Sequence, residues 1–207
     1  MARVAPIARS PRPFPLVRAA LLAALVFVTL PFAVAQTYRL IGTADIAFDG
    51  IEKRFEAYEV SSEYRTVFTA TWETDGFIAG DTWWIDVVMW EREDAEAAAG
   101  EGESLLSFRF FIDPASGEVV APTWFHAPDV SFVPVHRESF PLYENFPAQT
   151  RVTLESLAWV GDVLSIQGRI VAVLGLVADY DTDVPDPAQT ISVEITFDLW
   201  EVVEIEY

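Results

Sequence analysis

The sequence contains no cysteine in 207 residues. This absence excludes disulfide partners, thiolate metal ligands, thiol nucleophiles and haem attached through cysteine. The fold must therefore be held together by its hydrophobic core alone, even in an oxidising compartment where disulfides would form. Chains of about 150 residues bury roughly 70% of their unfolded surface, so a single domain of this length can build such a core.

Basic residues are also scarce. Thirteen Lys and Arg stand against 32 Asp and Glu, which gives a formal net charge of −19, and Lys53 is the only lysine. Such a charge repels phosphate backbones and anionic lipid surfaces, so we expect no nucleic-acid partner. The same composition is produced by a GC-rich genome and by adaptation to high salt, and both origins are compatible with it.

The first 35 residues have the pattern of a secretory signal peptide. Four arginines precede an apolar run from Ala19 to Leu30, and the small residues Ala33 and Ala35 follow it. A basic start, a short apolar core and a small-x-small tripeptide are the parts of such a leader. We predict cleavage after Ala35, which assigns 1–35 to the signal peptide and 36–207 to one all-β domain. The alternative is an uncleaved anchor from Ala19 to Ala35, which has about the minimum length for a membrane span.

Export fixes the expected compartment and the charge of the mature chain. We expect a periplasmic or extracellular protein, with a bacterium as its source. Four of the 13 basic residues leave with the leader and all 32 acidic residues stay, so the mature charge is 9 − 32 = −23. A charge of this size favours solubility.

Beyond the leader, long helical patterns are missing and apolar residues recur at every second position. In the last strand Ile191, Val193, Ile195, Phe197 and Leu199 alternate with polar residues. Asp49-Gly50 provides a tight hairpin turn, and a change of parity after Ala57 predicts a β-bulge in the following strand. Ser139 to Gln149, rich in aromatic residues and proline, is predicted to be a loop. About nine or ten strands with regular turn signals predict a single-domain antiparallel β-sandwich of jelly-roll-like form.

The stretch from Thr82 to Arg92 carries the strongest functional signal. As a strand it places Trp83, Ile85, Val87 and Met89 on one face, which is typical of a core contribution. The opposite face carries Trp84, Asp86 and Trp90. Sugar-binding β-proteins use exposed aromatic side chains beside hydrogen-bonding carboxylates, so these three residues are a candidate ligand-binding face for a polysaccharide. The alternative is that a loop or a second sheet covers both indoles.

A second candidate is an acidic segment near the end of the chain. Alternating aspartates resemble the first half of a calcium loop, and the predicted metal ligands are Asp179, Asp181, Asp183 and Asp186. An EF-hand requires glycine at its sixth position and glutamate at its twelfth, where this chain has Val184 and Thr190. The alternative is a solvated acidic hairpin loop, and we predict no cofactor other than Ca²⁺ at this loop.

Catalytic motifs are missing. The only histidines, His126 and His136, do not face each other in the expected hairpin, and no hydrolase, metalloprotease or nucleotide-binding motif occurs. We therefore predict no catalytic residues and a non-enzymatic protein. It either binds a ligand such as a polysaccharide or serves as a structural component of the cell envelope.

The C-terminus suggests a further alternative, a small outer-membrane β-barrel. The chain ends on Tyr207 after an alternating strand, and this resembles the assembly signal of outer-membrane proteins. Against it, Glu201 would point into lipid, and Pro122 and Pro134 interrupt candidate spans.

Overall fold

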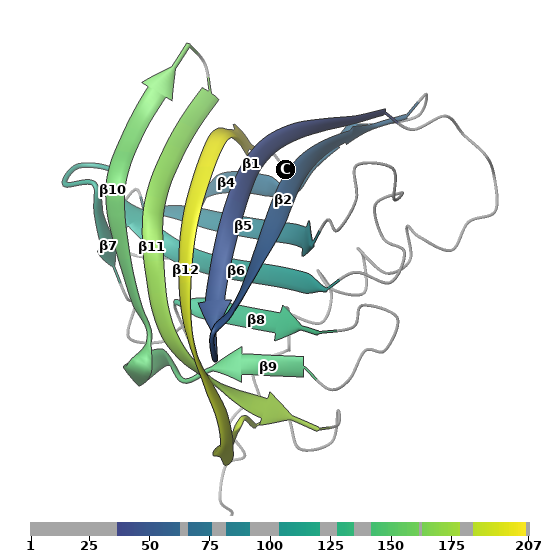
Figure 1. Ribbon diagram of the computed structural model, residues 1–207. Coiled ribbons are helices and arrows are strands. Elements are labelled where there is room, and N and C mark those ends of the chain that lie inside the picture. Colours follow the sequence, from purple (N-terminus) through teal and green to yellow (C-terminus); the bar gives the residue numbers. More distant parts are fainter. Residues whose placement is uncertain are drawn as a thin grey trace, which may run out of the picture. The chain divides into compact units, whose positions relative to one another are not determined.

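The computed structural model describes residues 37–62, 66–75, 82–91, 104–120, 128–134, 142–161, 163–178 and 184–205 (Figure 1). All of them belong to one compact unit, Ala35–Tyr207. The predicted signal peptide, residues 1–35, lies outside the described residues. In the described ranges the chain consists of β-strands and a single 3₁₀ turn, so the all-β prediction is confirmed.

Twelve strands occur in the described residues, more than the nine or ten expected. They are β1 (Thr37–Phe48), β2 (Ile51–Ser61), β3 (Thr66–Phe68), β4 (Ala70–Asp75), β5 (Thr82–Glu91), β6 (Leu105–Asp113), β7 (Glu118–Val120), β8 (Asp129–Val133), β9 (Leu142–Asn145), β10 (Arg151–Val160), β11 (Val163–Val177) and β12 (Asp186–Glu204). The 3₁₀ turn η1 (Pro147–Gln149) lies between β9 and β10.

The described strands form one hydrogen-bonded sheet, in the order β10-β11-β9-β8-β6-β5-β4-β12-β1-β2-β3, with β7 paired to β6. Additional pairings, β11 with β12 and β5 with β2, close this path on itself. All pairs are antiparallel except β4 and β12, which run parallel. Figure 1 shows β10, β11, β12, β1 and β2 side by side in one layer, with β5, β6 and β8 running across behind them. The prediction of a sandwich implies two separate sheets. Instead, the hydrogen bonding joins the described strands into one mixed sheet that supplies both layers.

Local sequence explains the hairpin between β1 and β2. Asp49 and Gly50 have φ angles of 48° and 77°, the positive values that a tight two-residue hairpin turn requires. The expected bulge is present in this hairpin, but on the other strand. Leu40 lies opposite Tyr58 and Gly42 opposite Ala57, so the extra residue is Ile41 of β1.

The segment from Ser139 to Gln149, predicted to be a loop, contains strand β9. Asn145, which is buried, explains this difference, because its side chain is fully hydrogen-bonded there. Its Oδ1 accepts a hydrogen bond from the Val130 N–H at 3.0 Å, and its Nδ2 donates to the Pro128 carbonyl at 2.8 Å and to Thr150 Oγ1 at 2.7 Å. These long-range bonds fix β9 beside β8 and cannot be deduced from local propensity.

The core lies between the two layers and is formed by the inward side chains. Ile195 of β12 is fully buried and lies opposite both Ile46 of β1 and Ile170 of β11. From the other layer, Phe108 and Phe110 of β6 pack against Phe197. Glu194 and Thr196, which alternate with the buried positions, are exposed. The predicted inside–outside alternation of the last strand is confirmed.

Strand β5 is a central core strand, as its sequence predicts. Ile85, Val87 and Met89 are fully buried, and Trp83 packs against the core while remaining partly exposed. The opposite side of β5 is half-buried along its length from Trp84 to Trp90. This strand thus places Trp83 on one side of the sheet and Trp84 and Trp90 on the other.

Candidate functional site

The structure brings two of the three predicted ligand-binding residues together and adds a third that the sequence did not reveal. Asp86 lies opposite Arg109 of β6, and Trp84 lies opposite Phe111. Arg109 Nη2 donates to Asp86 Oδ2 at 2.9 Å, and the guanidinium carbon lies 4.7 Å from the centre of the Trp84 ring. The Trp84 and Phe111 ring centres are 5.2 Å apart. Arg109 thus makes a cation–π contact with Trp84 while it is paired with Asp86.

Arg109 is unusually buried for an arginine on the outward side of a strand. It is 8% exposed, and in the described part of the chain its Nε is the one buried side-chain nitrogen or oxygen without a hydrogen-bond partner. The side chain of Asp86 is 32% exposed, so solvent reaches the acidic partner more easily than the basic one. Because Arg109 and Phe111 contact Trp84, a ligand has less access to this indole than the sequence alone suggests.

Trp90 belongs to a different group. Its ring centre lies 6.4 Å from that of Tyr58, and its register partner on β2 is Glu56. The Tyr58 hydroxyl donates to the Glu56 carboxylate. Trp84 and Asp86 therefore form one cluster and Trp90 another, although all three lie on the same side of β5. The proposed ligand contact of this face stays a prediction.

Three other tryptophans meet at a place that the sequence did not indicate. Trp72 of β4, Trp83 of β5 and Trp159 of β10 form what we call the indole cluster. The ring centres of Trp72 and Trp83 are 5.2 Å apart, and Trp159 lies 5.8 Å from each of them. The plane of Trp159 is inclined by 80° to Trp72 and by 86° to Trp83, so both contacts are edge-to-face.

Exposure differs sharply within the indole cluster. Trp72 is 7% exposed, whereas Trp159 is 51% exposed and is followed by Val160 at 62%. Trp159 lies opposite Leu164 on β11, which is fully buried, so the indole extends from the edge of the core into solvent. No described ring stacks parallel on Trp159 in these contacts. The result is an exposed indole that is held in place by two others.

Polar residues lie beside the indole cluster. Glu204 of β12 is the register partner of Trp72, and Thr74 of β4 is the register partner of Trp83. Both are exposed. Register partners on adjacent strands present their side chains to the same face of the sheet. A carboxylate and a hydroxyl therefore lie beside the two indoles that hold Trp159.

The indole cluster could not be predicted from the sequence, because Trp72 and Trp83 belong to one strand pair and Trp159 belongs to another. Trp159 alternates with Leu157 just before the Gly161 turn, and this pattern predicts a strand end without naming a partner. Only the placement of β10 relative to β4 and β5 brings the three rings together.

The predicted calcium ligands Asp179, Asp181 and Asp183 lie outside the described residues. Asp186 is described, and its carboxylate accepts hydrogen bonds from the Ala188 N–H and the Gln189 side-chain amide, both at 2.8 Å. These bonds, the Ala188 bond first, lower the pKa of Asp186. Across the described ranges no group of three or more His, Asp or Glu is arranged to hold a metal ion. The calcium site stays a prediction.

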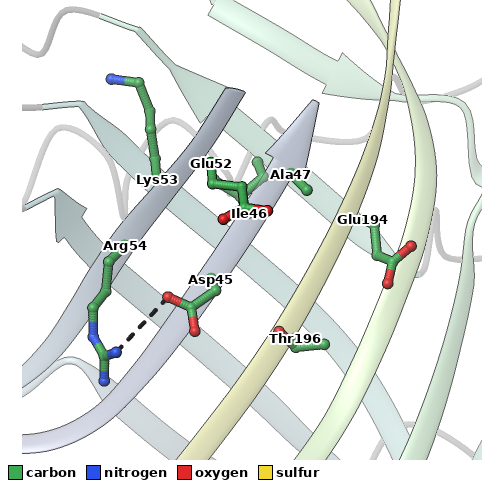
Figure 2. A pocket seen from close by; sticks show the side chains of 8 residues that line it. All are labelled: Asp45, Ile46, Ala47, Glu52, Lys53, Arg54, Glu194 and Thr196. Atoms are coloured by element: carbon green, nitrogen blue, oxygen red, sulfur yellow. Dashed lines mark ion pairs between the residues drawn. The ribbon is translucent and has the colours of Figure 1, made fainter. Parts of the chain in front are cut away.

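A shallow hollow of about 490 Å³ lies over the outer side of β1, β2 and β12 (Figure 2). Its lining residues are Asp45, Ile46, Ala47, Glu52, Lys53, Arg54, Glu194 and Thr196. Charged residues of this surface pair with one another, Arg54 with Asp45 at 4.0 Å and Arg169 with Glu194 at 2.6 Å. Figure 2 shows Lys53 extending away from Asp45 and Arg54, and its Nζ binds Glu91 Oε2 at 2.6 Å. Four charged residues of the lining, Asp45, Lys53, Arg54 and Glu194, are therefore in ion pairs.

Comparison with protein-family models, with curated proteins and with solved structures found no match to this chain. In the ranges that the structure describes, no helix has the length and apolar character needed to cross a membrane. His126 and His136 lie outside those ranges. The functional argument therefore rests on the geometry of the described side chains.

Proposed function

We propose that this chain is an exported, non-enzymatic binding protein whose ligand stacks on the indole cluster. The observation that carries the proposal is the 51% exposure of Trp159 while two indoles hold it edge-on. Tryptophan combines a large apolar surface with little side-chain freedom, so a fixed, exposed indole gives contact area at a small entropic cost. Such preorganisation favours binding.

The three described carboxyl groups with a resolved pKa shift support binding over acid–base catalysis. A general acid at neutral pH needs a raised pKa. The carboxyl groups with a resolved shift, Asp113, Asp186 and Glu201, all have lowered pKa values because they accept hydrogen bonds. Asp86 and Glu91 are paired with Arg109 and Lys53. These carboxylates are arranged as charged structural partners.

The outer side of β12 is suited to contact with water, which agrees with the proposed export to the periplasm or the extracellular space. Its outward residues Glu194, Thr196 and Asp198 are polar, and the first two are exposed. Fractionation of the producing cell tests this part of the proposal. We expect recovery without detergent and a mature N-terminus at Gln36 by mass spectrometry. Recovery only from membranes after detergent extraction would contradict it.

Binding by the indole cluster is tested with three tryptophan variants of the exported chain. Trp159→Ala removes the exposed indole, and Trp200→Ala is the matched control, because Trp200 is 38% exposed on β12 and is not part of the indole cluster. The probes are neutral oligosaccharides, uronic-acid oligosaccharides and fatty acids, and binding is followed by calorimetry. We expect at least one probe class to bind, with affinity lost in Trp159→Ala and kept in Trp200→Ala.

The third variant, Trp84→Ala, separates this proposal from the sequence-based one. Loss of binding in Trp84→Ala with full affinity in Trp159→Ala would refute the role of the indole cluster and favour the outward face of β5. Absence of binding to every probe would refute a role in binding these classes and favour the structural envelope role. Near-ultraviolet circular dichroism of each variant verifies that it is folded.

A further inference from the structure

We infer that the ligand of the indole cluster is a neutral saccharide chain, and that Glu204 and Thr74 fix the orientation of one sugar ring. This inference rests on the proposed binding role of the indole cluster and adds the chemical class of the ligand and two specificity-determining residues.

The first argument is the combination of surfaces at the site. A pyranose ring has an apolar C–H face and a rim of hydroxyl groups. The C–H face matches the flat indole of Trp159, which is 51% exposed. The hydroxyl rim needs hydrogen-bonding partners beside that indole, because polar groups that lose water without a new partner cost free energy. Glu204 and Thr74 are the register partners of Trp72 and Trp83, the two indoles that Trp159 contacts.

The second argument is the complementarity of donors and acceptors. An ionised carboxylate only accepts hydrogen bonds, whereas a threonine hydroxyl both donates and accepts. Two hydroxyls on one sugar ring can satisfy both groups, one by donating to Glu204 and the other by bonding with Thr74. Hydrogen bonds to a charged acceptor are stronger than neutral ones, so Glu204 is the dominant partner.

Charge and desolvation argue against the other ligand classes. An anionic ligand would meet the carboxylate of Glu204 and a chain with a net charge of −19. A purely apolar ligand such as a fatty acid chain would cover Glu204 without supplying a hydrogen-bond donor, and burying an unpaired carboxylate is costly. A neutral, hydroxyl-rich ring avoids both penalties.

The experiment uses the exported chain and isothermal titration calorimetry with defined probes. These are linear hexasaccharides of β-1,4-linked glucose, mannose and xylose, a uronic-acid oligosaccharide as the anionic probe, and palmitate as the probe with a long apolar chain. We expect one neutral hexasaccharide to bind, with negligible binding of the anionic and apolar probes.

Variants then test the two parts of the contact. Trp159→Phe keeps an aromatic face, so its affinity is expected to stay within about threefold, whereas Trp159→Leu keeps bulk without the flat face and is expected to lose at least tenfold. Glu204→Gln retains the shape of the side chain and removes its charge, and about a tenfold loss is expected. Glu194→Gln, an exposed glutamate on the outer side of the same strand, is the matched control and leaves the affinity unchanged.

The outcomes separate this inference from the proposed function. Palmitate binding that depends on Trp159, with no neutral saccharide bound, would overturn the saccharide class while the binding role of the indole cluster stands. Saccharide binding that is unchanged in both Glu204→Gln and Thr74→Val would overturn the orienting role of those residues. If no probe binds in a manner that depends on Trp159, the proposed function falls and this inference falls with it.

Discussion

At the scale of single residues, the best-defined interaction is the ion pair between Asp86 and Arg109. The arginine is almost completely buried and makes one hydrogen bond with Asp86 at 2.9 Å, while its Nε has no partner in the described structure. An unsatisfied buried N–H costs about 1–3 kcal/mol. The cation–π contact with Trp84 offsets part of this cost, since such contacts contribute about 0.5–2 kcal/mol. The net contribution of the pair to the free energy of unfolding is therefore small, and its clearest structural role is to hold the guanidinium over the Trp84 ring.

A double-mutant cycle tests this account of the pair. Asp86→Ala is expected to lower the free energy of unfolding by about 3 kcal/mol, because it leaves the buried guanidinium without a counter-charge. Arg109→Met keeps an unbranched, apolar side chain beside Trp84 and leaves only a partly exposed carboxylate, so a loss of about 1 kcal/mol is expected. Urea unfolding measures both, and the double variant is expected to be more stable than Asp86→Ala alone. Additive losses would show that the two side chains do not interact.

At the scale of elements, β12 organises the sheet. It pairs with β1, β11 and β4, and its inward residues form the middle of the core. At its irregular part, Glu201 receives hydrogen bonds from Arg39 of β1, with Arg39 Nη2 at 2.6 Å from Glu201 Oε1. Arg39 also donates to Glu59 of β2. This guanidinium therefore links three neighbouring strands where the register of β12 against β11 shifts.

The link between Arg39 and Glu201 predicts a specific pH dependence. The hydrogen bonds from Arg39 lower the pKa of Glu201 from its ordinary value. The stabilisation is therefore present at pH values well above the pKa of glutamate in the unfolded chain, and it is lost as the pH falls through the lowered pKa of Glu201 in the folded protein. We expect acidification from pH 6 to pH 3 to destabilise the wild type more than Glu201→Gln. The difference should be about 0.5 kcal/mol, because Arg39 is largely exposed.

Urea unfolding at the two pH values measures this difference. Glu52→Gln is the control, since it removes one carboxylate from an exposed position on the neighbouring strand β2. An equal pH response of the wild type and Glu201→Gln would contradict a stabilising role for this ion pair.

Sequence patterns predicted much at this scale. Alternation in β5 and β12 correctly assigned which side chains face the core, because successive side chains of a strand point to opposite sides. The bulge was expected on β2 and lies on β1 at Ile41, since a parity change shows that two strands are out of step without showing which one carries the extra residue. Strand β9 was missed because its position depends on the long-range hydrogen bonds of Asn145.

At the scale of the whole molecule, the dominant property is negative charge. The formal net charge is −19, and five of the described basic residues, Arg39, Lys53, Arg54, Arg109 and Arg169, are paired with acidic ones. The remaining excess of acidic groups repels itself in the folded state. Dissolved ions screen such repulsion over distances beyond about 10 Å at 0.1 M salt.

Salt is therefore expected to stabilise this protein. Raising sodium chloride from 20 mM to 500 mM should increase the melting temperature by several degrees, since about 1 kcal/mol corresponds to roughly 2–4 °C for a chain of this size. Differential scanning calorimetry measures the shift, and a net-neutral β-protein of similar length is the control. A fall in melting temperature with salt would show that the ion pairs outweigh the general repulsion.

The sequence by itself determined the all-β class, the inward side chains of the central strands and the excess of negative charge. These properties are local or additive, because backbone stereochemistry fixes the alternation of side chains and charges are simply counted. Only the tertiary structure decided which tryptophans meet. Trp84 and Trp90 share one face of β5 but belong to separate clusters, whereas Trp83, on the other face, joins Trp72 and Trp159. Contact between strands from different hairpins depends on how one layer crosses the other, and no local pattern specifies that placement.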